Sequence, residues 1–379
     1  MPSRTEIATA TAADLRRFAP TAGDTPVLIG FDGFIDSIIS VVDKRYDVDR
    51  YDPIPTIARF AEKIAAAAGK SSNYELVTRQ QKLGGNGPIM ANAMARAGFD
   101  IHYVGAVGAG EIHPIFKEFE AIAKLHGIAA PAFTDALEFS DGKLMIGKHE
   151  SLRNVKQEQI DAVLGRDTFT KLVRGVKLLA TVNWSMCPLL GTVWDALADE
   201  ILPGNAQRPA VFIDLTDPEK RTEQDLKTAL DEIANLATMT QVTLGMNLKE
   251  ASQVAHVLGI EVEDEPELAI ESTAAMLREA LSLHCAVVHP RRAAAGAMLG
   301  EDGQVHRATF HGPFIENPVL STGAGDNFNA GFCLGMLAGM PIEQCLCAGT
   351  ATSGFYVRNA KSPTLDGLAG FCETLPEPQ

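Results

Sequence analysis

Short apolar runs recur along the chain, and stretches with the periodicity of amphipathic helices separate most of them. Runs of this length that are rich in aliphatic and β-branched residues are typical of buried strands. Strands are predicted at residues 27–29, 101–107, 178–184, 210–215, 241–244 and 286–289, and helices between them at residues 56–68, 222–237 and 268–281. This alternation predicts an α/β fold of three layers, in which helices flank both faces of a mainly parallel central sheet. Ligands of such folds bind at the carboxyl ends of the strands.

Two segments break this alternation. Residues 37–52 and 131–153 are rich in charge and alternate apolar with polar positions, as strands with an exposed face do. No repeat or linker divides the chain, so we predict one domain over residues 21–374, with an N-terminal extension (1–20) and a flexible tail (375–379). Within the extension, residues 12–18 are expected to form a short amphipathic helix outside the main fold.

The composition allows a sizeable core and restricts the partners. Of the 379 residues, 46% are apolar, and the formal net charge is −15 with a pI near 5.1. Nucleic acids and anionic membranes need clustered Lys and Arg, so neither is expected as the main partner. No apolar segment is long enough to span a bilayer, and the 6 cysteines show no zinc-site spacing. We therefore expect a cytoplasmic protein with free thiols that acts on small molecules.

A turn of small residues near the C-terminus carries the strongest chemical signal. Residues 321–326 read Ser-Thr-Gly-Ala-Gly-Asp and precede an apolar run over residues 328–337. The backbone N–H groups of such a turn can close on an anion at a helix start, where the dipole also favours negative charge. Asp326 would repel that anion, so it is best explained as a base that takes a proton from an attacking hydroxyl. The pattern predicts a kinase that phosphorylates an alcohol.

Two carboxylates follow the first predicted strand. Residues 30–36 read Gly-Phe-Asp-Gly-Phe-Ile-Asp, so Asp32 and Asp36 lie at the sheet edge where ligands bind. Each carboxylate oxygen can take two donors, which suits these residues to sugar hydroxyls. The alternative is an Asx turn that only ends the strand.

A glycine pair opens the next candidate element. Residues 83–88 read Leu-Gly-Gly-Asn-Gly-Pro, and a helix is predicted over residues 89–97. Gly84 and Gly85 allow the backbone to approach a ligand closely, and Asn86 is a nearby amide.

Asn247 and Glu250 follow the strand at 241–244 and lie one turn apart at the start of a helix. Such a pair can position Mg²⁺ through water molecules near nucleotide phosphates, because Mg²⁺ keeps much of its hydration shell. The same spacing is also that of a helix capping box.

Basic residues near the predicted nucleotide region are few. Arg291 and Arg292 either contact nucleotide phosphates or form a charged turn between strands. Arg221 either offsets phosphate charge or is a solvated surface residue, and no role is predicted for His289.

Together these stretches resemble the ribokinase-like (pfkB) family of carbohydrate kinases over roughly residues 27–371. The Gly-Ala-Gly-Asp turn is similar to the family's C-terminal signature, the Gly-Gly pair to its N-terminal signature, and Asn247 with Glu250 to its Asn-x-x-Glu motif. The resemblance implies a ribokinase-like fold with a small β-sheet lid from residues 37–52 and 131–153. It also implies ATP as phosphoryl donor, Mg²⁺ as cofactor and Asp36 as a sugar contact.

The chain departs from the family pattern in two places. Ile89 stands where sugar kinases such as ribokinase carry an Asn, and Leu320-Ser321 precedes Thr322 where the signature usually starts with Asp-Thr. The Ile-Asp ending at Asp36 and the Ile-Met-Ala-Asn run ending at Asn92 resemble the ADP-dependent sugar kinases.

The main hypothesis is transfer of the terminal phosphoryl group of ATP to a hydroxyl of a sugar or sugar-like substrate. The alternatives are an ADP-dependent sugar kinase, a nucleoside kinase and a catalytically silent regulatory protein that binds sugar or nucleotide. A homodimer through the lid strands is a further hypothesis. The predicted site comprises catalytic Asp326, Gly323, Ala324 and Gly325; substrate-binding Asp32, Asp36, Gly84, Gly85, Asn86 and Asn92; nucleotide-binding Asn247, Thr322, Arg291 and Arg292; and Asn247 and Glu250 for Mg²⁺.

Overall fold

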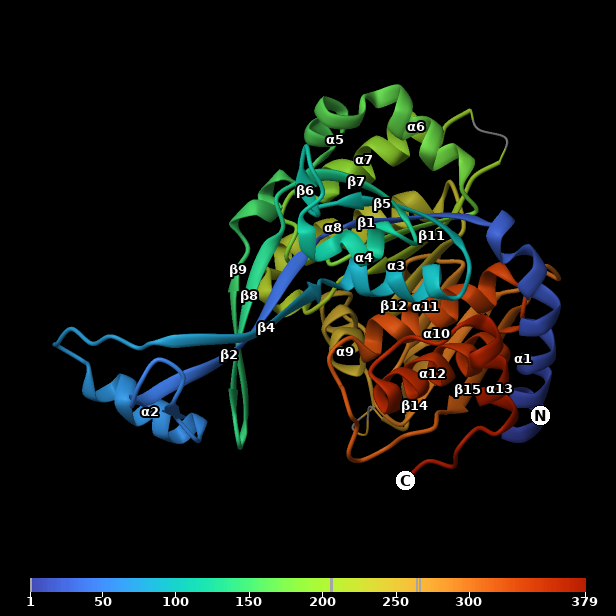
Figure 1. Ribbon diagram of the computed structural model, residues 1–379. Helices are drawn as coiled ribbons and strands as arrows, with labels where there is room; N and C mark the ends of the chain where they lie inside the picture. The colour runs from blue at the N-terminus through green and yellow to red at the C-terminus, as the bar shows by residue number, and fades with distance from the viewer. Residues whose placement is uncertain (1, 205–206, 264, 266) are drawn as a thin grey trace.

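A ten-stranded sheet forms the centre of the protein in the computed structural model, which describes residues 2–204, 207–263, 265 and 267–379 (Figure 1). From β13 to β7 all neighbouring strands are parallel, and β14, β15 and β6 add antiparallel edges. The mainly parallel sheet is therefore confirmed. In spatial order the strands are β15 (Val305–His311), β14 (Ala293–Leu299), β13 (Cys285–Val288), β12 (Val242–Met246), β11 (Ala210–Asp214), β10 (Leu178–Val182), β1 (Pro26–Phe31), β5 (Asp100–Gly105), β7 (Lys124–Ala129) and β6 (Gly108–Ala109).

Helices cover both faces of this sheet, as predicted. Successive side chains of a strand point to opposite faces, so Leu28 packs into one helical layer while Val27 and Ile29 pack into the other. The first layer contains α5 (Gln157–Leu164), α6 (Arg166–Gly175), α7 (Gly191–Ala196), α8 (Glu223–Ala237), α9 (Leu248–Val257) and α10 (Ile270–Ala280). The second contains α1 (Arg4–Phe18), α3 (Asn86–Arg96), α4 (Lys117–Glu120), α11 (Ala324–Leu337), α12 (Ile342–Asn359) and α13 (Leu365–Glu373).

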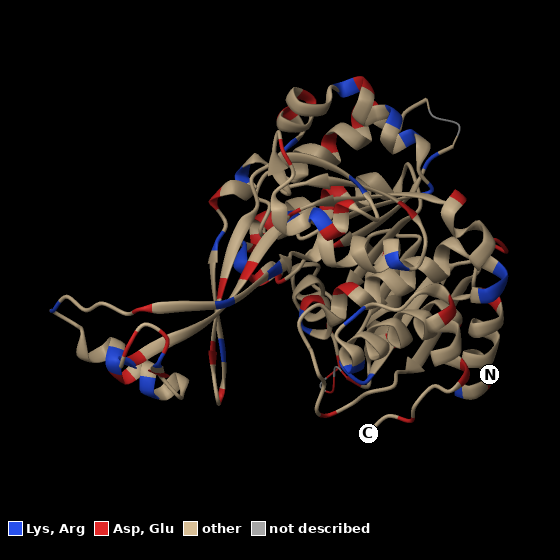
Figure 2. Cartoon of the chain, viewed as in Figure 1, with Lys and Arg blue, Asp and Glu red and all other residues tan. Residues whose placement is uncertain are grey.

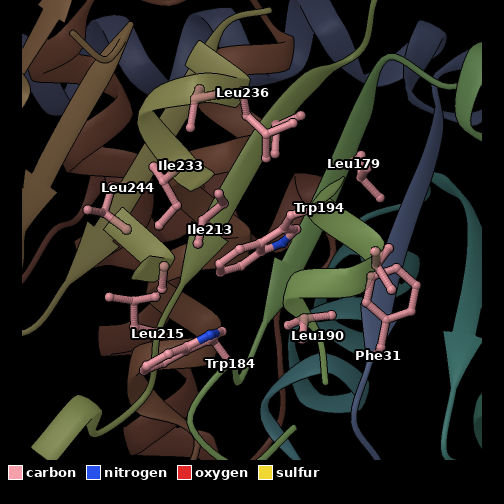
Figure 3. Packing of buried hydrophobic residues seen from close by; sticks show 14 of the residues in the cluster. Phe31, Leu179, Trp184, Leu190, Trp194, Ile213, Leu215, Ile233, Leu236 and Leu244 are labelled. Atoms are coloured by element: carbon pink, nitrogen blue, oxygen red, sulfur yellow. The ribbon is translucent and has the colours of Figure 1, made fainter. Parts of the chain in front are cut away.

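Large buried side chains fill the space between the sheet and the first helical layer. Trp194 lies fully buried among aliphatic residues of the sheet and of α8, and its indole Nε1 donates a hydrogen bond of 2.9 Å to Thr181 Oγ1 (Figure 3). This bond satisfies the one polar group that the ring brings into the core.

A second, five-stranded sheet extends away from the main body (Figure 1). We call it the lid. One helix, α2 (Ile57–Ala66), packs on it through Phe60, which belongs to one buried cluster with Ile39 and Leu137. The lid consists of β2 (Phe34–Arg45), β3 (Tyr51–Pro53), β4 (Leu76–Gly84), β8 (Ala132–Phe139) and β9 (Gly142–Lys148). The predicted small sheet is thus confirmed, but β4 was not predicted, because its residues are mostly polar and exposed.

The N-terminal helix does not stand outside the main fold as expected. It begins at Arg4 and packs against α12 and α13, with Ala12 and Leu15 buried in the second layer. Small Ala and Thr residues weaken the apolar stripe of this helix, so the sequence pattern showed only part of it. Arg4 also donates to the carbonyl oxygen of Pro376 at 2.5 Å, and so hydrogen-bonds the tail that we predicted to be flexible.

Positions of Lys and Arg and positions of Asp and Glu are intermixed along the helices and the lid (Figure 2). None of the helices in the described ranges combines the length and the apolar character that crossing a membrane requires.

Candidate functional site

Polar residues gather where successive strands of the central sheet end. Because parallel strands end at the same edge, residues far apart in sequence meet there. The residues at these ends are Asp32 after β1, Asn183 after β10, Asp214 at the end of β11, Asn247 after β12 and His289 after β13. Asn183 has a φ of 64°, a left-handed conformation that is uncommon outside glycine and often marks a functional site.

A cavity of about 550 Å³ opens at this edge of the sheet. Its lining includes all the predicted catalytic and metal-binding residues, most of the predicted nucleotide-binding residues and one predicted substrate-binding residue: Asn86, Asn247, Glu250, Arg291, Arg292, Gly323, Ala324, Gly325 and Asp326. The predicted residues outside its lining are Asp32, Asp36, Gly84, Gly85, Asn92 and Thr322.

The predicted anion-binding turn forms the start of α11. Gly323 has a φ of 89°, a left-handed conformation that glycine adopts without strain. The Ala324 amide donates to the carbonyl of Ser321 at 3.2 Å, whereas the amides of Gly325 and Asp326 have no hydrogen bond within the described ranges. The carbonyl of Thr322 accepts from Tyr356 Oη at 2.9 Å, which holds the turn in place. Two N–H groups at the positive end of a helix therefore remain available to an anion.

Asp326 is positioned by a residue that lies 240 positions earlier in the chain. Asn86 Nδ2 donates to Asp326 Oδ1 at 2.8 Å, and the carboxylate is only 7% exposed. Burial and the negative charge of Asp214 raise the pKa of Asp326 well above its ordinary value. A carboxylate with a raised pKa is a stronger base when it is ionised, as the predicted role requires.

Asp32 lies beneath Asn86 and is completely buried, away from the cavity. Its Oδ2 accepts from the Asn86 amide at 3.0 Å and from Asn183 Nδ2 at 2.7 Å, and its Oδ1 accepts from the Gly87 amide at 2.8 Å. Burial raises the pKa of Asp32 to about 6, although these hydrogen bonds oppose the rise. Asp32 thus caps α3, where Gly85 has no side chain to do so. This place differs from the sugar contact that the sequence led us to expect.

Asp36 lies on β2 of the lid, directly over Gly84 at the end of β4. A Cβ added to Gly84 would come within 2.4 Å of the Asp36 carboxylate, so this contact requires glycine. Asp36 is 7% exposed, and burial raises the pKa of its carboxyl group, opposed mainly by the charge of Lys82. Gly85, with a φ of 100°, then turns the chain into α3 and toward Asn86.

Asn92 does not reach this region. It lies six residues after Asn86, or roughly 9 Å further along α3 at the usual helical rise. Its side chain is half-buried outside the lining of the cavity.

Asn247 and Glu250 form the capping box that was the alternative interpretation of their spacing. Asn247 Oδ1 accepts from the Glu250 amide at 3.0 Å, and Glu250 Oε2 accepts from the Asn247 amide at 2.8 Å. Glu250 Oε1 also accepts from the Asp217 amide at 3.0 Å. Carboxylate oxygens have further lone pairs, so the capping box leaves room for water-mediated contacts.

Asp214 is a cavity residue that the sequence analysis missed. Its Oδ1 accepts from the Thr216 amide at 2.8 Å, and its Oδ2 from Asn329 Nδ2 at 2.6 Å. Burial raises the pKa of this carboxyl group. The sequence signals were its position near the end of a predicted strand, which many structural Asp residues share, and an incomplete resemblance of residues 214–221 to the family's Asp-x-Asn-x-Arg stretch.

The carboxylates of Asp214, Glu250 and Asp326 fit a divalent cation electrostatically. All line the cavity, and the charge of Asp214 helps to raise the pKa of Glu250 and of Asp326. A cation between them would relieve this repulsion. Within the described ranges, no group of three or more His, Cys, Asp or Glu residues is placed to hold a metal directly. Contact through water, as predicted for Asn247 and Glu250, is the mode that fits.

Glu250→Gln is expected to raise the Mg²⁺ concentration needed for half-maximal rate, because the amide cannot offer a charged acceptor. Burial, followed by the charge of Asp214, raises the pKa of Glu250 to about 7, so protons should compete with Mg²⁺. In the wild type, the required Mg²⁺ concentration should therefore rise as pH falls below about 7, and this dependence should weaken in Glu250→Gln. Mg²⁺ titrations of the rate at several pH values measure both effects. If the two proteins give the same curves, Glu250 only caps α9.

The three arginines considered for the nucleotide phosphates lie in different places relative to the cavity. The guanidinium groups of Arg291 and Arg292 lie 5.3 Å and 4.1 Å from the ring centroid of Phe314, and all three residues line the cavity. Arg292 Nη1 also donates to the main-chain oxygen of Gln379 at 2.7 Å. Arg221 stacks on Trp184 at 4.2 Å and is not among the residues that line the cavity.

The chain is similar to known sugar kinases along nearly its whole length. The profile of the family described as prokaryotic ketohexokinase matches residues 4–374. A ketohexokinase from Haloferax volcanii is 31% identical over 351 residues, which cover 91% of this chain and 90% of that protein.

Solved structures confirm the predicted ribokinase-like fold. A carbohydrate kinase from Agrobacterium tumefaciens has a TM-score of 0.63 and 16% identity, covering 93% of this chain and 98% of that one. Ribokinase from Arabidopsis thaliana, complexed with ribose and ATP, has a TM-score of 0.62 and 16% identity, covering 92% of this chain and 98% of that one. Identities this low carry the likeness of fold alone.

Proposed function

Because the chain belongs to the prokaryotic ketohexokinase family, we propose that it transfers the terminal phosphoryl group of ATP to a hydroxyl of a ketohexose. Transfer from ATP to a sugar is the chemistry of the family, and the chain is a carbohydrate kinase. The 31% identity to a protein named ketohexokinase, over 91% of the chain, carries the proposal of a ketohexose as acceptor.

Asp326 acts as the general base in this proposal. Asn86 holds Oδ1 through its 2.8 Å hydrogen bond, so Oδ2 is the oxygen that takes the proton of the attacking hydroxyl. As the hydroxyl loses its proton, its oxygen attacks the terminal phosphorus, and the bond from phosphorus to the bridging oxygen of the leaving ADP breaks.

The free amides of Gly325 and Asp326 hold the phosphoryl group during this attack. Arg291 and Arg292, on the cavity wall, offset the remaining phosphate charge. Asn247 and Glu250, together with Asp214, would hold Mg²⁺ through water, and the ion would neutralise charge on the phosphates when bound.

The sugar lies between the lid and Asp326 in this proposal. Asp36 and the backbone at Gly84 and Gly85 form one wall, and Asn86 connects that wall to Asp326. Asp32, which we expected to touch the sugar, is instead proposed to position Asn86 from below.

Asp36→Ala is expected to raise KM for the sugar by roughly 10- to 100-fold, the loss of one hydrogen bond to a charged group. KM for ATP should stay close to wild type. Steady-state kinetics with each substrate varied in turn measures both constants. Asp135→Ala is a matched control, because Asp135 lies on the neighbouring strand β8 opposite Ser37, on the other face of the lid, where it pairs with Lys148 at 2.8 Å. An unchanged sugar KM in Asp36→Ala would remove this residue from the site.

The test of the function is a panel of ketoses, aldoses and nucleosides crossed with ATP, ADP and GTP, scored for phosphorylated product. We expect product with ATP and a ketohexose. Product only with ADP, or only with a nucleoside, would favour the corresponding alternative. Binding without product for every pair would favour a silent regulatory protein.

The lid also supports the proposed homodimer. Its strands β8 and β9 carry exposed apolar side chains on one face, Phe133 at 40% and Ile146 at 49%, which a second lid would cover. Molar mass in solution, compared with that of a variant with charges at both positions, tests this.

A further inference from the structure

His289 borders the cavity, and the mechanism above leaves it without a role. It follows β13, and its main-chain amide donates to the carbonyl of Met246 on β12 at 2.9 Å. Its ring stacks on Phe328 of α11, with centroids 4.4 Å apart and planes inclined by 28°. Phe328 itself is only 3% exposed. The sheet therefore fixes the main chain of His289, and Phe328 of α11 fixes the plane of its ring.

The polar edge of this ring faces the anion-binding turn. A Cβ built on Gly325 would lie 3.7 Å from His289 Cε1, the carbon between the two ring nitrogens. The other edge of the ring, Cγ with Cδ2, therefore points away from the turn. A ligand oxygen held by the Gly325 amide would come close to a ring nitrogen.

One of these nitrogens has no partner. Nε2 is buried and forms no hydrogen bond within the described residues. Buried polar atoms in folded proteins nearly always have a partner, and at a cavity wall a bound ligand can supply it. Desolvation lowers the pKa of His289 to about 4, so the ring is neutral near pH 7 and offers one N–H donor.

We propose that His289 Nε2–H donates a hydrogen bond to the same nucleotide phosphate that the Gly325 and Asp326 amides hold. This proposal rests on the proposed function, because it takes the anion at the turn to be a phosphate of the nucleotide. His289 then adds a side-chain donor to a turn that otherwise offers only main-chain donors. The main-chain bond to Met246 fixes the position of the residue, and Phe328 fixes the plane of its ring, before the nucleotide arrives.

The competing explanation is that His289 only packs against Phe328. Two substitutions separate packing from hydrogen bonding. His289→Phe keeps an aromatic ring on Phe328 and removes both nitrogens. His289→Gln places an amide N–H near the position of Nε2 and removes the ring. If packing is the whole role, Phe should be the milder change; if donation matters, Gln should be.

The experiment is calorimetric binding of adenosine, AMP, ADP and ATP to the wild type and to both variants, with the fold checked by thermal melting. We expect His289→Phe to weaken the binding of ATP roughly 10- to 100-fold, the usual effect of losing a hydrogen bond to a charged group. The affinities for adenosine, AMP and ADP should be unchanged, because the two amides hold the terminal phosphoryl group of ATP in the proposed function; the loss should therefore first appear with ATP. His289→Gln should bind ATP within about 3-fold of wild type.

Two results would overturn the proposal. ATP binding that is unchanged in His289→Phe would make His289 a packing residue. An equal loss for adenosine and ATP would place the ring against the base or the ribose. Should His289→Phe not fold, His289→Asn replaces it, because its shorter amide falls near Nδ1 and cannot reach the phosphate; Asn and Gln variants with equal ATP affinity would then contradict the proposal.

The wild type in the same experiment keeps this inference separate from the proposed function. Absence of ATP binding to the wild type would contradict the kinase function itself. Normal binding to the wild type with no effect in the variants would contradict only the role of His289.

Discussion

Asp326→Asn is expected to lower kcat by roughly 10²- to 10⁴-fold, because the amide keeps the shape of the side chain but cannot accept a proton. Nucleotide binding should survive and is expected to tighten, since a negative charge beside the phosphates is removed. Turnover and calorimetric ATP binding, measured on the same preparation, provide the test. Near-wild-type turnover by a correctly folded Asp326→Asn protein would contradict the assigned mechanism.

The pH dependence of the wild type gives a second readout of Asp326. Burial raises the pKa of this carboxyl group, so the base becomes protonated at pH values above the ordinary range for Asp. The rate should therefore begin to fall at these pH values as the pH is lowered. The hydrogen bond from Asn86 acts in the opposite direction and lowers this pKa. Asn86→Ala should therefore move the acid limb of the pH–rate profile to higher pH. A role for Asn86 confined to sugar binding would leave that limb in place.

Asp32→Ala is expected to lower the free energy of unfolding by roughly 2–5 kcal/mol, because it leaves several buried N–H donors without an acceptor. The donors are the amides of Asn86 and Gly87 and the Nδ2 group of Asn183. The rate should fall as well, since Asn86 loses its support and no longer fixes Asp326. Chemical denaturation and steady-state kinetics measure the two effects.

The stability loss in Asp32→Ala should also depend on pH. Burial raises the folded-state pKa of Asp32 to about 6, above its unfolded value, so its contribution to stability is complete below the unfolded pKa and declines as pH rises through 6. The loss on substitution should therefore be larger at pH 5 than at pH 8. Asp36→Ala serves as the control and should change stability little, because Asp36 accepts no main-chain amide within the described ranges. Asp32→Ala could instead behave like Asp36→Ala, raising the sugar KM and leaving the free energy of unfolding unchanged. Asp32 would then be the sugar contact that its sequence position first indicated.

Wherever local sequence fixes the conformation, the sequence predicted the fold well. Six of the ten strands of the central sheet appear at the predicted places (β1, β5, β10, β11, β12 and β13), because strands buried on both faces are continuous apolar runs. The four strands toward the two edges of the sheet (β6, β7, β14 and β15) were not predicted. β4 was not predicted because its residues are polar and give no apolar run. They form a strand only by pairing with β2, which lies some distance away in the sequence. The N-terminal helix was underestimated because its buried face is made of small residues that match α12 and α13.

In the candidate site, too, local sequence sets some features and the tertiary structure sets the others. By itself, the sequence determined the turn of Gly323–Gly325, the place of Asp326 at the start of α11, and the pairing of Asn247 with Glu250. Each of these depends on helix starts and spacings within a few residues, where backbone geometry follows directly from residue type. Only the tertiary structure decided that Asn86 holds Asp326, that Asp32 supports Asn86 from a buried position, and that Asp214 and His289 join the cavity. These contacts connect the ends of different strands, and the burial that sets the pKa values of Asp32 and Asp326 exists only after the sheet and both helical layers have assembled.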